Sequence, residues 1–294
     1  MATEILLGTA QGLRAVGGAT VALEGRRVTA LVSAGEGWLA VAEHRTVVDD
    51  AGSVRAEVPG AAVTCVTGYG SGALVGTEDA GLLRIDGGTV SPVEGFADAE
   101  GRSSWYTPWG GPPSTQSVAT APDGTPYVNV HVGGILRSRD GGKTWQQTID
   151  VDVDVHQVVA DRSGVLLAAC GAEGLAVSRD GGDSWRLDTA GLHATYCRAV
   201  AVAGDTVLVS AAMGPRGGRA AVYRRPLDDD GEFERCTAGL PSWFDDNIDT
   251  YRLDGRGDLA AFASADGRVF VSHDAGASWD EADRADRVAA LAVR

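Results

Sequence analysis

The sequence predicts an all-β protein: a seven-bladed β-propeller of four-stranded antiparallel blades, closed by pairing the C-terminal strand with the N-terminal blade. Three observations predict this fold. A short motif recurs along the chain, four short apolar segments accompany each copy, and the segments left over at the two ends complement each other. With 41 glycines in 294 residues and 44% hydrophobic residues, the chain has the turns and the core that many short strands require.

The recurring motif has Ser, Asp, Gly, Ser or Thr, and Trp at fixed positions, and it occurs at Ser138–Trp145, Ser178–Trp185 and Ser272–Trp279. Its Asp can accept backbone N–H groups of the following turn, its glycines supply positive φ, and its Trp packs beneath the hairpin. Trp145 and Trp185 are 40 residues apart, whereas Trp185 and Trp279 are 94 apart. One copy between them has therefore decayed. We assign the motif a structural role and give no chemistry to Asp140, Asp180 and Asp274.

The four-segment pattern divides most of the chain into six complete units, at residues 27–58, 61–93, 114–150, 155–188, 196–237 and 248–281. Residues 4–24 supply three further strands and residues 285–294 supply one. Joined, these two segments make a seventh blade of the ~40 to 45 residues that a four-stranded propeller repeat needs. We therefore expect a single domain over residues 1–294, whose closure removes exposed sheet edges.

Composition excludes several classes of partner. The formal net charge of −15 argues against nucleic acid and anionic membranes, because both are polyanions that need a basic surface. The four cysteines are far apart and include no Cys-x-x-Cys pair, so they are expected to be reduced thiols. We see no signal peptide and no run approaching the ~20 apolar residues of a membrane span. The expected location is the cytoplasm.

Long connectors between blades mark the face where function is expected. They lie at residues 96–115, 189–196 and 239–247. Aromatic rings on such loops either pack on each other or stack on a ligand. The ligand-binding candidates in these connectors are Trp105, Tyr106, Trp109, His193, Tyr196 and Trp243.

Two neighbouring segments carry alternating polar rows. Tyr127, Asn129 and His131 alternate with valines, and so do Asp152, Asp154 and His156, so each row shares one face of its strand. His131 ends a strand that rises to the connector face and His156 begins one that descends from it. We therefore expect the two imidazoles to be neighbours at the mouth of the central funnel.

Two imidazoles with one or two carboxylates can bind a divalent metal ion or act as an acid/base pair near neutral pH. The alternative is a hydrogen-bonded polar plug that fixes the registration of the blades. The candidate metal ligands are His131, His156 and Asp154. The candidate catalytic residues are His131, His156, Asp245 and Asp246, and the rows add Tyr127 and Asn129 to the ligand-binding candidates.

Further residues near the predicted site have possible roles in binding or in packing. Arg198 can clamp a carboxylate or phosphate of the ligand, or pair structurally with Asp154 or Asp246. Cys197 is interpreted as a buried thiol. Acidic and imidazole side chains at equivalent strand ends of earlier blades can complete an acidic rim around the mouth of the funnel: Glu43, His44, Glu78 and Asp79.

The motif and its spacing resemble the Asp-box (BNR) repeat propellers, which include sialidases, xyloglucan hydrolases, sortilin-type receptor propellers and the photosystem II assembly factor. The resemblance covers the whole chain and implies the fold, but it says little about activity. The Trp-Gly-Gly-Pro-Pro loop with residues 127–134 is similar to uncharacterised actinobacterial propellers labelled glycosyl hydrolase-like. Sialidases carry an Arg-Ile-Pro near the N-terminus, where residues 13–16 here read Leu-Arg-Ala-Val, so we do not expect a classical sialidase.

The leading hypothesis is a propeller that binds a small polar ligand, a sugar or a carboxylated metabolite, in the funnel under the aromatic loops. Catalysis of the hydrolase or lyase type there, by acid/base or metal-assisted chemistry, is left open. One alternative is a protein-interaction scaffold or assembly factor with a protein partner. The other is a glycoside hydrolase with a carboxylate pair, in which Asp245 or Asp246 faces Asp154 across a cleft.

Overall fold

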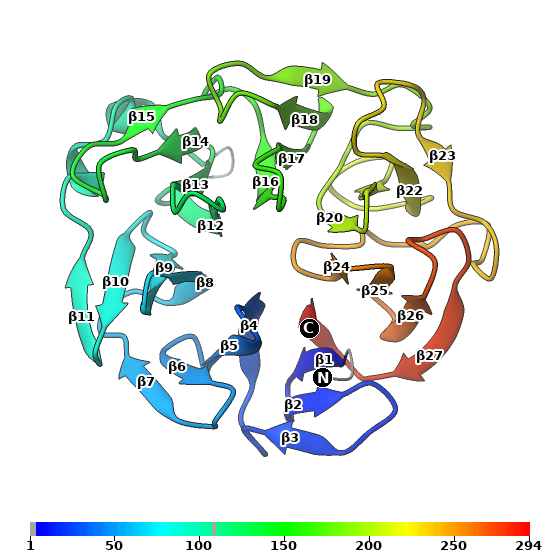
Figure 1. Cartoon of the computed structure of the whole chain (residues 1–294), viewed down its shortest axis with the longest axis horizontal. Helices are drawn as coiled ribbons and strands as arrows, with labels where there is room; N and C mark the ends of the chain where they lie inside the picture. Colours follow the sequence, from blue (N-terminus) through cyan, green and yellow to red (C-terminus); the bar gives the residue numbers. More distant parts are fainter. Residues whose placement is uncertain (1–3, 108–109) are drawn as a thin grey trace.

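The computed structural model describes residues 4–107 and 110–294. They form seven four-stranded antiparallel sheets, arranged as blades around a central axis (Figure 1). The predicted all-β, seven-bladed propeller is thus confirmed. The helical elements of this part of the chain are two short 3-10 helices, η1 (Phe96–Asp98) and η2 (Arg102–Ser104). Neither could cross a membrane.

Each blade pairs its strands in chain order from the axis outward, apart from the first blade, whose innermost strand comes from the C-terminus. Blade one contains β28 (Val288–Val293), β1 (Ile5–Thr9), β2 (Gly12–Ala15) and β3 (Thr20–Ala22). Blade two contains β4 (Val28–Ala34), β5 (Gly37–Ala42), β6 (Thr46–Asp49) and β7 (Val54–Glu57). Blade three contains β8 (Val63–Tyr69), β9 (Gly72–Thr77), β10 (Leu82–Asp86) and β11 (Thr89–Pro92).

The remaining four blades follow the same order. Blade four contains β12 (Ser114–Thr120), β13 (Pro126–His131), β14 (Gly134–Arg137) and β15 (Gln146–Gln147). Blade five contains β16 (Val155–Ala160), β17 (Leu166–Cys170), β18 (Gly174–Ser178) and β19 (Arg186–Asp188). Blade six contains β20 (Val200–Ala203), β21 (Thr206–Ala211), β22 (Ala221–Pro226) and β23 (Glu234–Arg235). Blade seven contains β24 (Leu253–Arg256), β25 (Leu259–Ala263), β26 (Arg268–Ser272) and β27 (Asp280–Arg284).

Closure of the ring depends on pairing between the two ends of the chain. β28 and β1 pair in antiparallel register, with Ile5 opposite Val293 and Leu7 opposite Leu291. Both leucines are buried, and the backbones of Glu4 and Arg294 exchange hydrogen bonds of 2.8 and 2.9 Å. Because this pairing supplies the innermost strand of blade one, no inner edge of a sheet is left open there.

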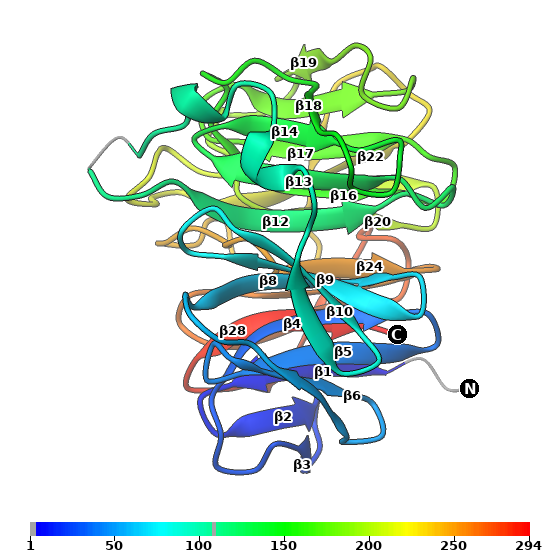
Figure 2. The same cartoon turned by 90° about the vertical axis from the view of Figure 1, so that its left-hand side faces the viewer.

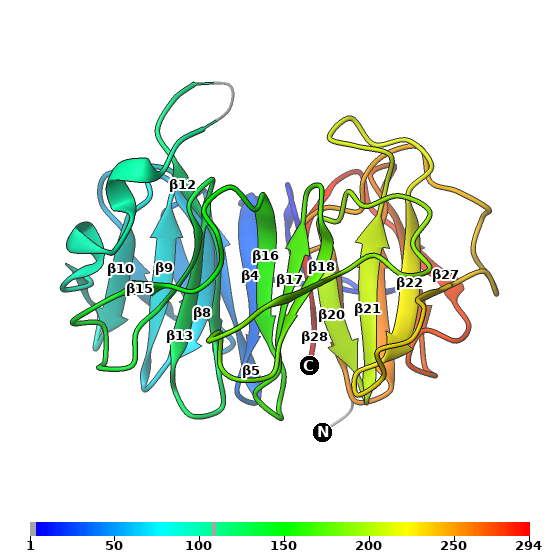
Figure 3. The ribbon, with the colours of Figure 1, turned by 90° about the horizontal axis from the view of Figure 1, so that it is seen from above.

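The ring has two distinct faces. We call the top face the side where connectors enter each innermost strand and where second strands turn into third strands. The bottom face is the opposite side. The loop between β21 and β22 and the described parts of the connector before β12 both rise from the top face, whereas β28 ends at the bottom face (Figures 2 and 3). Tyr196 and Phe244, in the second and third long connectors, bridge to Ala212 and Ala220 at the two ends of this loop. The three long connectors therefore share the top face, as predicted.

The Asp-box turns join the third and fourth strands at the bottom face. In the first, Asp140 accepts hydrogen bonds from the backbone of Lys143 and Thr144 at 3.0 and 2.9 Å, and Trp145 Nε1 donates to the Gly142 carbonyl at 3.1 Å. Backbone and hydroxyl donors from Thr144 lower the pKa of Asp140 to about 2. This confirms the predicted structural role of the motif, which is to stabilise the turn between two strands.

The decayed copy of the motif is visible in blade six. Phe233 directly precedes β23, as Trp185 directly precedes β19 and Trp279 directly precedes β27. Phe233 is 3% exposed, so it fills the space of the lost tryptophan. Asp228 stands five residues before Phe233, as Asp140 stands before Trp145, but Pro226 and Glu232 replace the two hydroxyl residues of the box.

Blades five and six are also joined by a buried ion pair. Arg225 Nη1 lies 2.5 Å from Asp188 Oδ2, and the two side chains are 2% and 4% exposed. Arg225 also stacks over Phe233, with its guanidinium carbon 4.2 Å from the ring centre. Removing one partner of such a pair leaves the other charge buried and uncompensated.

Substitution Asp188→Ala is therefore expected to lower the free energy of unfolding by about 3 kcal/mol, measured by urea denaturation. The double variant Asp188→Leu/Arg225→Met should recover most of the loss, because it removes both charges. The control Arg186→Ala alters a half-exposed partner of the same carboxylate and should cost less than about 1 kcal/mol. Equal losses in both single variants would contradict the assignment.

Candidate functional site

The candidate site lies on the top face where blades four and five meet. His131 is the last residue of β13 and Asp154 directly precedes β16. His156 lies in β16 at a register shift between Val155 and Gln157. Such a bulge bends the strand and re-aims a side chain. Equivalent shifts occur near the start of β4, β8 and β12, where the extra residues are Thr29, Thr64 and Gln116.

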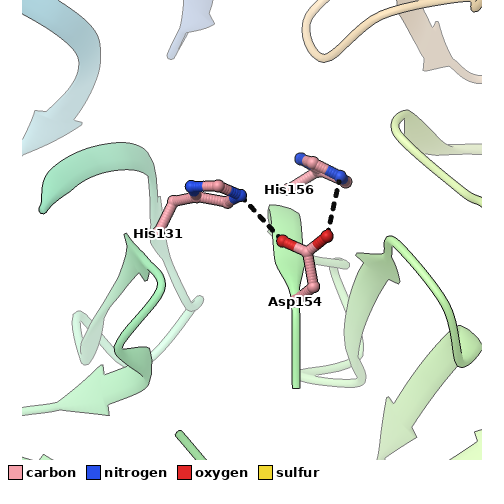
Figure 4. A group of neighbouring side chains, drawn as sticks. All are labelled: His131, Asp154 and His156. Carbon is pink, nitrogen blue, oxygen red and sulfur yellow. Dashed lines mark ion pairs between the residues drawn. The ribbon is translucent and has the colours of Figure 1, made fainter. Parts of the chain in front are cut away.

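The carboxylate of Asp154 lies between the two imidazoles. His131 Nε2 is 2.7 Å from Asp154 Oδ1, and His156 Nε2 is 3.5 Å from Asp154 Oδ2. The two rings are stacked with centres 5.4 Å apart, and both point toward the carboxylate (Figure 4). The structure thus brings the three predicted metal ligands together, each offering one ligand atom within 4.8 Å of the others.

Burial sets the protonation of the cluster. It lowers the pKa of His156 to about 4, because the neighbouring Asp154 carboxylate only partly offsets the loss of solvent. Burial alone would raise the pKa of Asp154, but the His131 hydrogen bond and nearby positive charges hold it below its usual range. At neutral pH His156 is therefore a neutral imidazole beside an ionised carboxylate, which is the protonation state that metal ligands need.

Space above the carboxylate depends on Gly171, the residue after β17. A Cβ on Gly171 would lie 2.1 Å from Asp154 Oδ2 and 3.1 Å from His156 Nε2. The Gly171 backbone N–H donates to the Asp154 carbonyl at 2.6 Å. A side chain at this position would fill the space in front of both groups, so glycine keeps it available.

The polar groups continue around the top mouth into blades six and seven. Tyr196 Oη is 3.1 Å from His156 Nε2, and Arg198 stacks over the Tyr196 ring. Arg198 Nη1 is 2.5 Å from Asp249 Oδ1, and Arg252 approaches the same carboxylate at 3.5 Å. The ion-pair partner of Arg198 is thus Asp249. The sequence-based alternatives, Asp154 and Asp246, were wrong.

In the first aromatic connector, which begins at residue 96, the described side chains pack mainly on one another. Trp105 is 7% exposed, with its ring centre 5.8 Å from Phe96 and 4.7 Å from the Arg102 guanidinium carbon. Its indole is therefore not available to stack on a ligand, contrary to the prediction. Tyr106 is 45% exposed and pairs through its backbone with Val132. The prediction for Trp109 concerns a residue outside the described part of the chain.

Two other predicted ligand-binding residues lie within the seam between blades four and five. Tyr127 Oη donates to the Gly181 carbonyl at 2.9 Å, in the Asp-box turn of blade five at the bottom face. The fully buried Asn129 donates from Nδ2 to the Val155 carbonyl at 2.9 Å. The alternation put both on the correct face of β13. That face packs on blade five, so the expectation that Tyr127 and Asn129 reach the ligand at the mouth was wrong.

His193 and Trp243 belong to a second cluster on blade six. Their ring centres are 4.6 Å apart, and His193 Nδ1 is hydrogen-bonded to Tyr223 Oη at 2.7 Å. Asp245 and Asp246 are exposed in the same connector, where the Asp245 carbonyl accepts from Gly218 N. Neither carboxylate belongs to the group formed by the two imidazoles and Asp154. The structure therefore separates these predicted residues from the histidine cluster.

The proposed rim residues in earlier blades are engaged in local contacts. His44 Nδ1 lies 3.2 Å from the Val63 carbonyl, Glu43 pairs with Arg27, and Glu78 accepts from Ala62 N. Cys197 is fully buried, and burial raises the pKa of its thiol to about 12. It is an inert core thiol, as predicted.

Sequence reasoning missed three residues that shape the site: Gly171, Asp249 and Arg252. Asp249 and Arg252 follow the third long connector directly, as Asp154 and His156 flank the start of β16. Polar residues at the start of each innermost strand were therefore the signal that could have found them. Gly171 has no such signal, because its role is set by neighbours distant in sequence.

The bottom mouth of the channel holds a cavity of about 750 Å³. It is lined largely by the turns between first and second strands, and its titratable groups include Asp161, Asp205 and Asp254. Asp161 caps its own turn through the backbone of Ser163 and Val165. The described residues around this cavity form no group of metal ligands, whereas His131, Asp154 and His156 at the top mouth do.

Comparisons with known proteins agree with this architecture. Residues 136–147 match the BNR/Asp-box repeat family model. The chain is a seven-bladed β-propeller with Asp-box repeats. No curated protein sequence matches it.

Solved structures with the same fold have diverse functions. YCF48 bound to a D1 peptide is 15% identical with a TM-score of 0.59, covering 92% of this propeller and 87% of that chain. The RRP9 WD40 repeats are 15% identical with a TM-score of 0.58, covering 91% and 81%. A GH74 xyloglucanase from Xanthomonas campestris is 14% identical with a TM-score of 0.60, covering 86% of this propeller and 44% of that enzyme. These identities show a shared fold alone.

Asp254, inside the channel, gives a pH-dependent prediction. Burial raises its pKa to about 6, above the ordinary value of 3.8, despite a 2.8 Å hydrogen bond from Val293 N. The folded state therefore binds more protons than the unfolded state between about pH 4 and 6, and stability falls as pH rises through this window.

Replacement Asp254→Asn keeps an acceptor for Val293 N and removes the titration. We expect the variant to be more stable than the parent by about 1 kcal/mol above pH 6, since Asp254 is only partly buried and solvent reduces the full ~1.4 kcal/mol per pKa unit, and equally stable below pH 4. Denaturant unfolding across pH 4 to 8 measures this. A constant difference over the whole range would argue against a raised pKa.

Proposed function

We propose that this propeller binds a divalent metal ion at the top mouth through His131, Asp154 and His156, and with it a small polar ligand that carries an anionic oxygen. The observation that carries the proposal is the convergence of two imidazole nitrogens and a carboxylate within 4.8 Å of one another. Two imidazoles and one carboxylate suit zinc, iron, nickel and related ions, and they leave coordination positions for water or ligand.

The surroundings support the same role. His156 is neutral at pH 7 because burial lowers its pKa, so a metal ion need not displace a proton from a charged ring. Asp154 supplies a negative charge that partly neutralises the ion. Gly171 keeps the front of the cluster free of side-chain atoms. These features leave room for an ion and for a ligand next to it.

In this proposal Tyr196 and Arg198 contact the ligand. The Tyr196 hydroxyl is next to His156, and the Arg198 guanidinium is 3.5 Å from that hydroxyl. An arginine beside a metal centre favours a ligand with a carboxylate or another oxyanion. The ion would supply Lewis acidity and lower the pKa of a bound water, which favours hydrolysis or elimination over simple storage of a metal.

The test begins with protein stripped of metal by chelation and dialysed. Isothermal titration calorimetry with Zn²⁺, Mn²⁺ and Ni²⁺, together with elemental analysis, should show one ion per chain. Variants His156→Ala and Asp154→Ala should each weaken binding by at least about a hundredfold, since each removes a direct ligand. Gly171→Ala should also weaken it, because its Cβ fills the space beside Asp154.

His193→Ala is the matched control, because it removes a histidine on the same face that belongs to the separate blade-six cluster. Its metal affinity should equal that of the parent protein. Circular dichroism checks that every variant is folded. No stoichiometric binding by the parent protein, or unchanged binding in the folded His156→Ala variant, would leave the cluster as a polar plug between blades.

A further inference from the structure

A second feature of the top face, on blade six, is a pair of arginines, Arg219 and Arg235, that contact one tryptophan ring and have no acidic partner. The chain has a net charge of −15, and most of its arginines form ion pairs. Among the described residues, the arginines without a carboxylate within 4.0 Å include four from blade six: Arg216, Arg219, Arg224 and Arg235. Free positive charge is thus concentrated on one blade of an acidic protein.

Two of these arginines are held against one indole. The guanidinium carbons of Arg219 and Arg235 lie 4.4 and 4.3 Å from the centre of the Trp243 ring. Stacking on the ring fixes the plane of a guanidinium and leaves its N–H edge free to donate to an oxyanion. Arg235 gives only a long bond of 3.4 Å to the Ser242 carbonyl, and Arg219 is exposed in the loop between β21 and β22.

The Trp243 ring, which both arginines contact, is itself held in place by its neighbours. Trp243 is half-buried against the core between blades five and six, and its ring contacts His193, which stacks on Tyr223 at 5.8 Å. The loop that carries Arg219 is fixed by bonds from Gly218 N to the Asp245 carbonyl and between Ala220 and Phe244. The arginines are therefore presented by a preorganised platform, which limits the entropy lost on binding.

The same loop offers an apolar contact. Met213 is 59% exposed, which makes it the most exposed large hydrophobic side chain of the described residues. Arginine and methionine are enriched at protein interfaces, where aromatic residues act as anchors. An extended segment with carboxylates for the two arginines and an apolar side chain for Met213 would match this surface.

We propose that the surface formed by Met213, Arg219, Arg235 and Trp243 binds an acidic peptide segment of a partner protein. Charge complementarity decides the kind of partner, because two guanidinium edges are open on one indole in a protein that is otherwise strongly acidic. This site is independent of the metal proposed at His131, Asp154 and His156, so removal of metal should not affect it.

The test uses fluorescein-labelled peptides of equal length in which leucine alternates with glutamate, glutamine or lysine. Fluorescence anisotropy with the parent protein should show saturable binding of the glutamate peptide alone, weakened by added NaCl. Arg219→Ala and Arg235→Ala should each reduce affinity about tenfold, as expected for the loss of a charge-assisted hydrogen bond. Chelation of metal should leave the affinity unchanged.

Arg224→Ala is the matched control, since Arg224 is also a blade-six arginine without an acidic partner but does not stack on Trp243. It should change affinity less than about twofold. The proposal is overturned if the glutamate peptide does not bind, or if Arg224→Ala weakens it as much as Arg219→Ala. It is also overturned if sedimentation shows that Arg219→Ala abolishes self-association, because the occupant is then a second copy of the chain.

Discussion

Closure of the ring by β28 and β1 is the constraint on which the rest of the structure depends. The two strands come from opposite ends of the chain, and their pairing places Leu7 and Leu291 in the core of blade one. Once the ring is closed, every blade packs against two neighbours, and the start of each innermost strand is fixed around one mouth. Residues more than 20 positions apart, such as His131 and Asp154, then meet across a seam between blades.

The candidate site is a consequence of this geometry. One second strand rises to the top face and ends at His131, while the next innermost strand descends from the same face with a bulge at His156. Asp154 lies between them and faces both rings. Such a cluster also ties two blades together, so the proposed metal ligands also contribute to the stability of the seam between them.

Much of this arrangement could be predicted from the sequence because it depends on repetition. The Asp-box motif gave the period, the complementary ends gave the closure, and strand direction gave the proximity of the two imidazoles. The sequence could not predict contacts that depend on which loop folds over which. Tyr127 was expected at the mouth because alternation identifies the face of a strand, but its distance along the strand directs it to the Asp-box turn of blade five.

The sequence also could not identify the contact partners of the arginine side chains. Arg198 pairs with Asp249 rather than with Asp154 or Asp246, because the end of the third connector brings Asp249 to the start of β20. The stacking of Arg219 and Arg235 on Trp243 joins a loop, a strand and a connector, and no spacing in the sequence indicates it. Repeats therefore predict the fold, whereas the candidate sites on the top face depend on contacts between irregular loops.

The most direct measurement is anomalous diffraction from crystals of the stripped protein grown with Zn²⁺, collected at the zinc absorption edge. A metal ion bound by the cluster should give one strong peak, about 2.0 to 2.2 Å from Nε2 of His131, Nε2 of His156 and an oxygen of Asp154. A peak only at His193 or at the bottom mouth, or no peak in crystals that retain the His131–Asp154 contact, would contradict it.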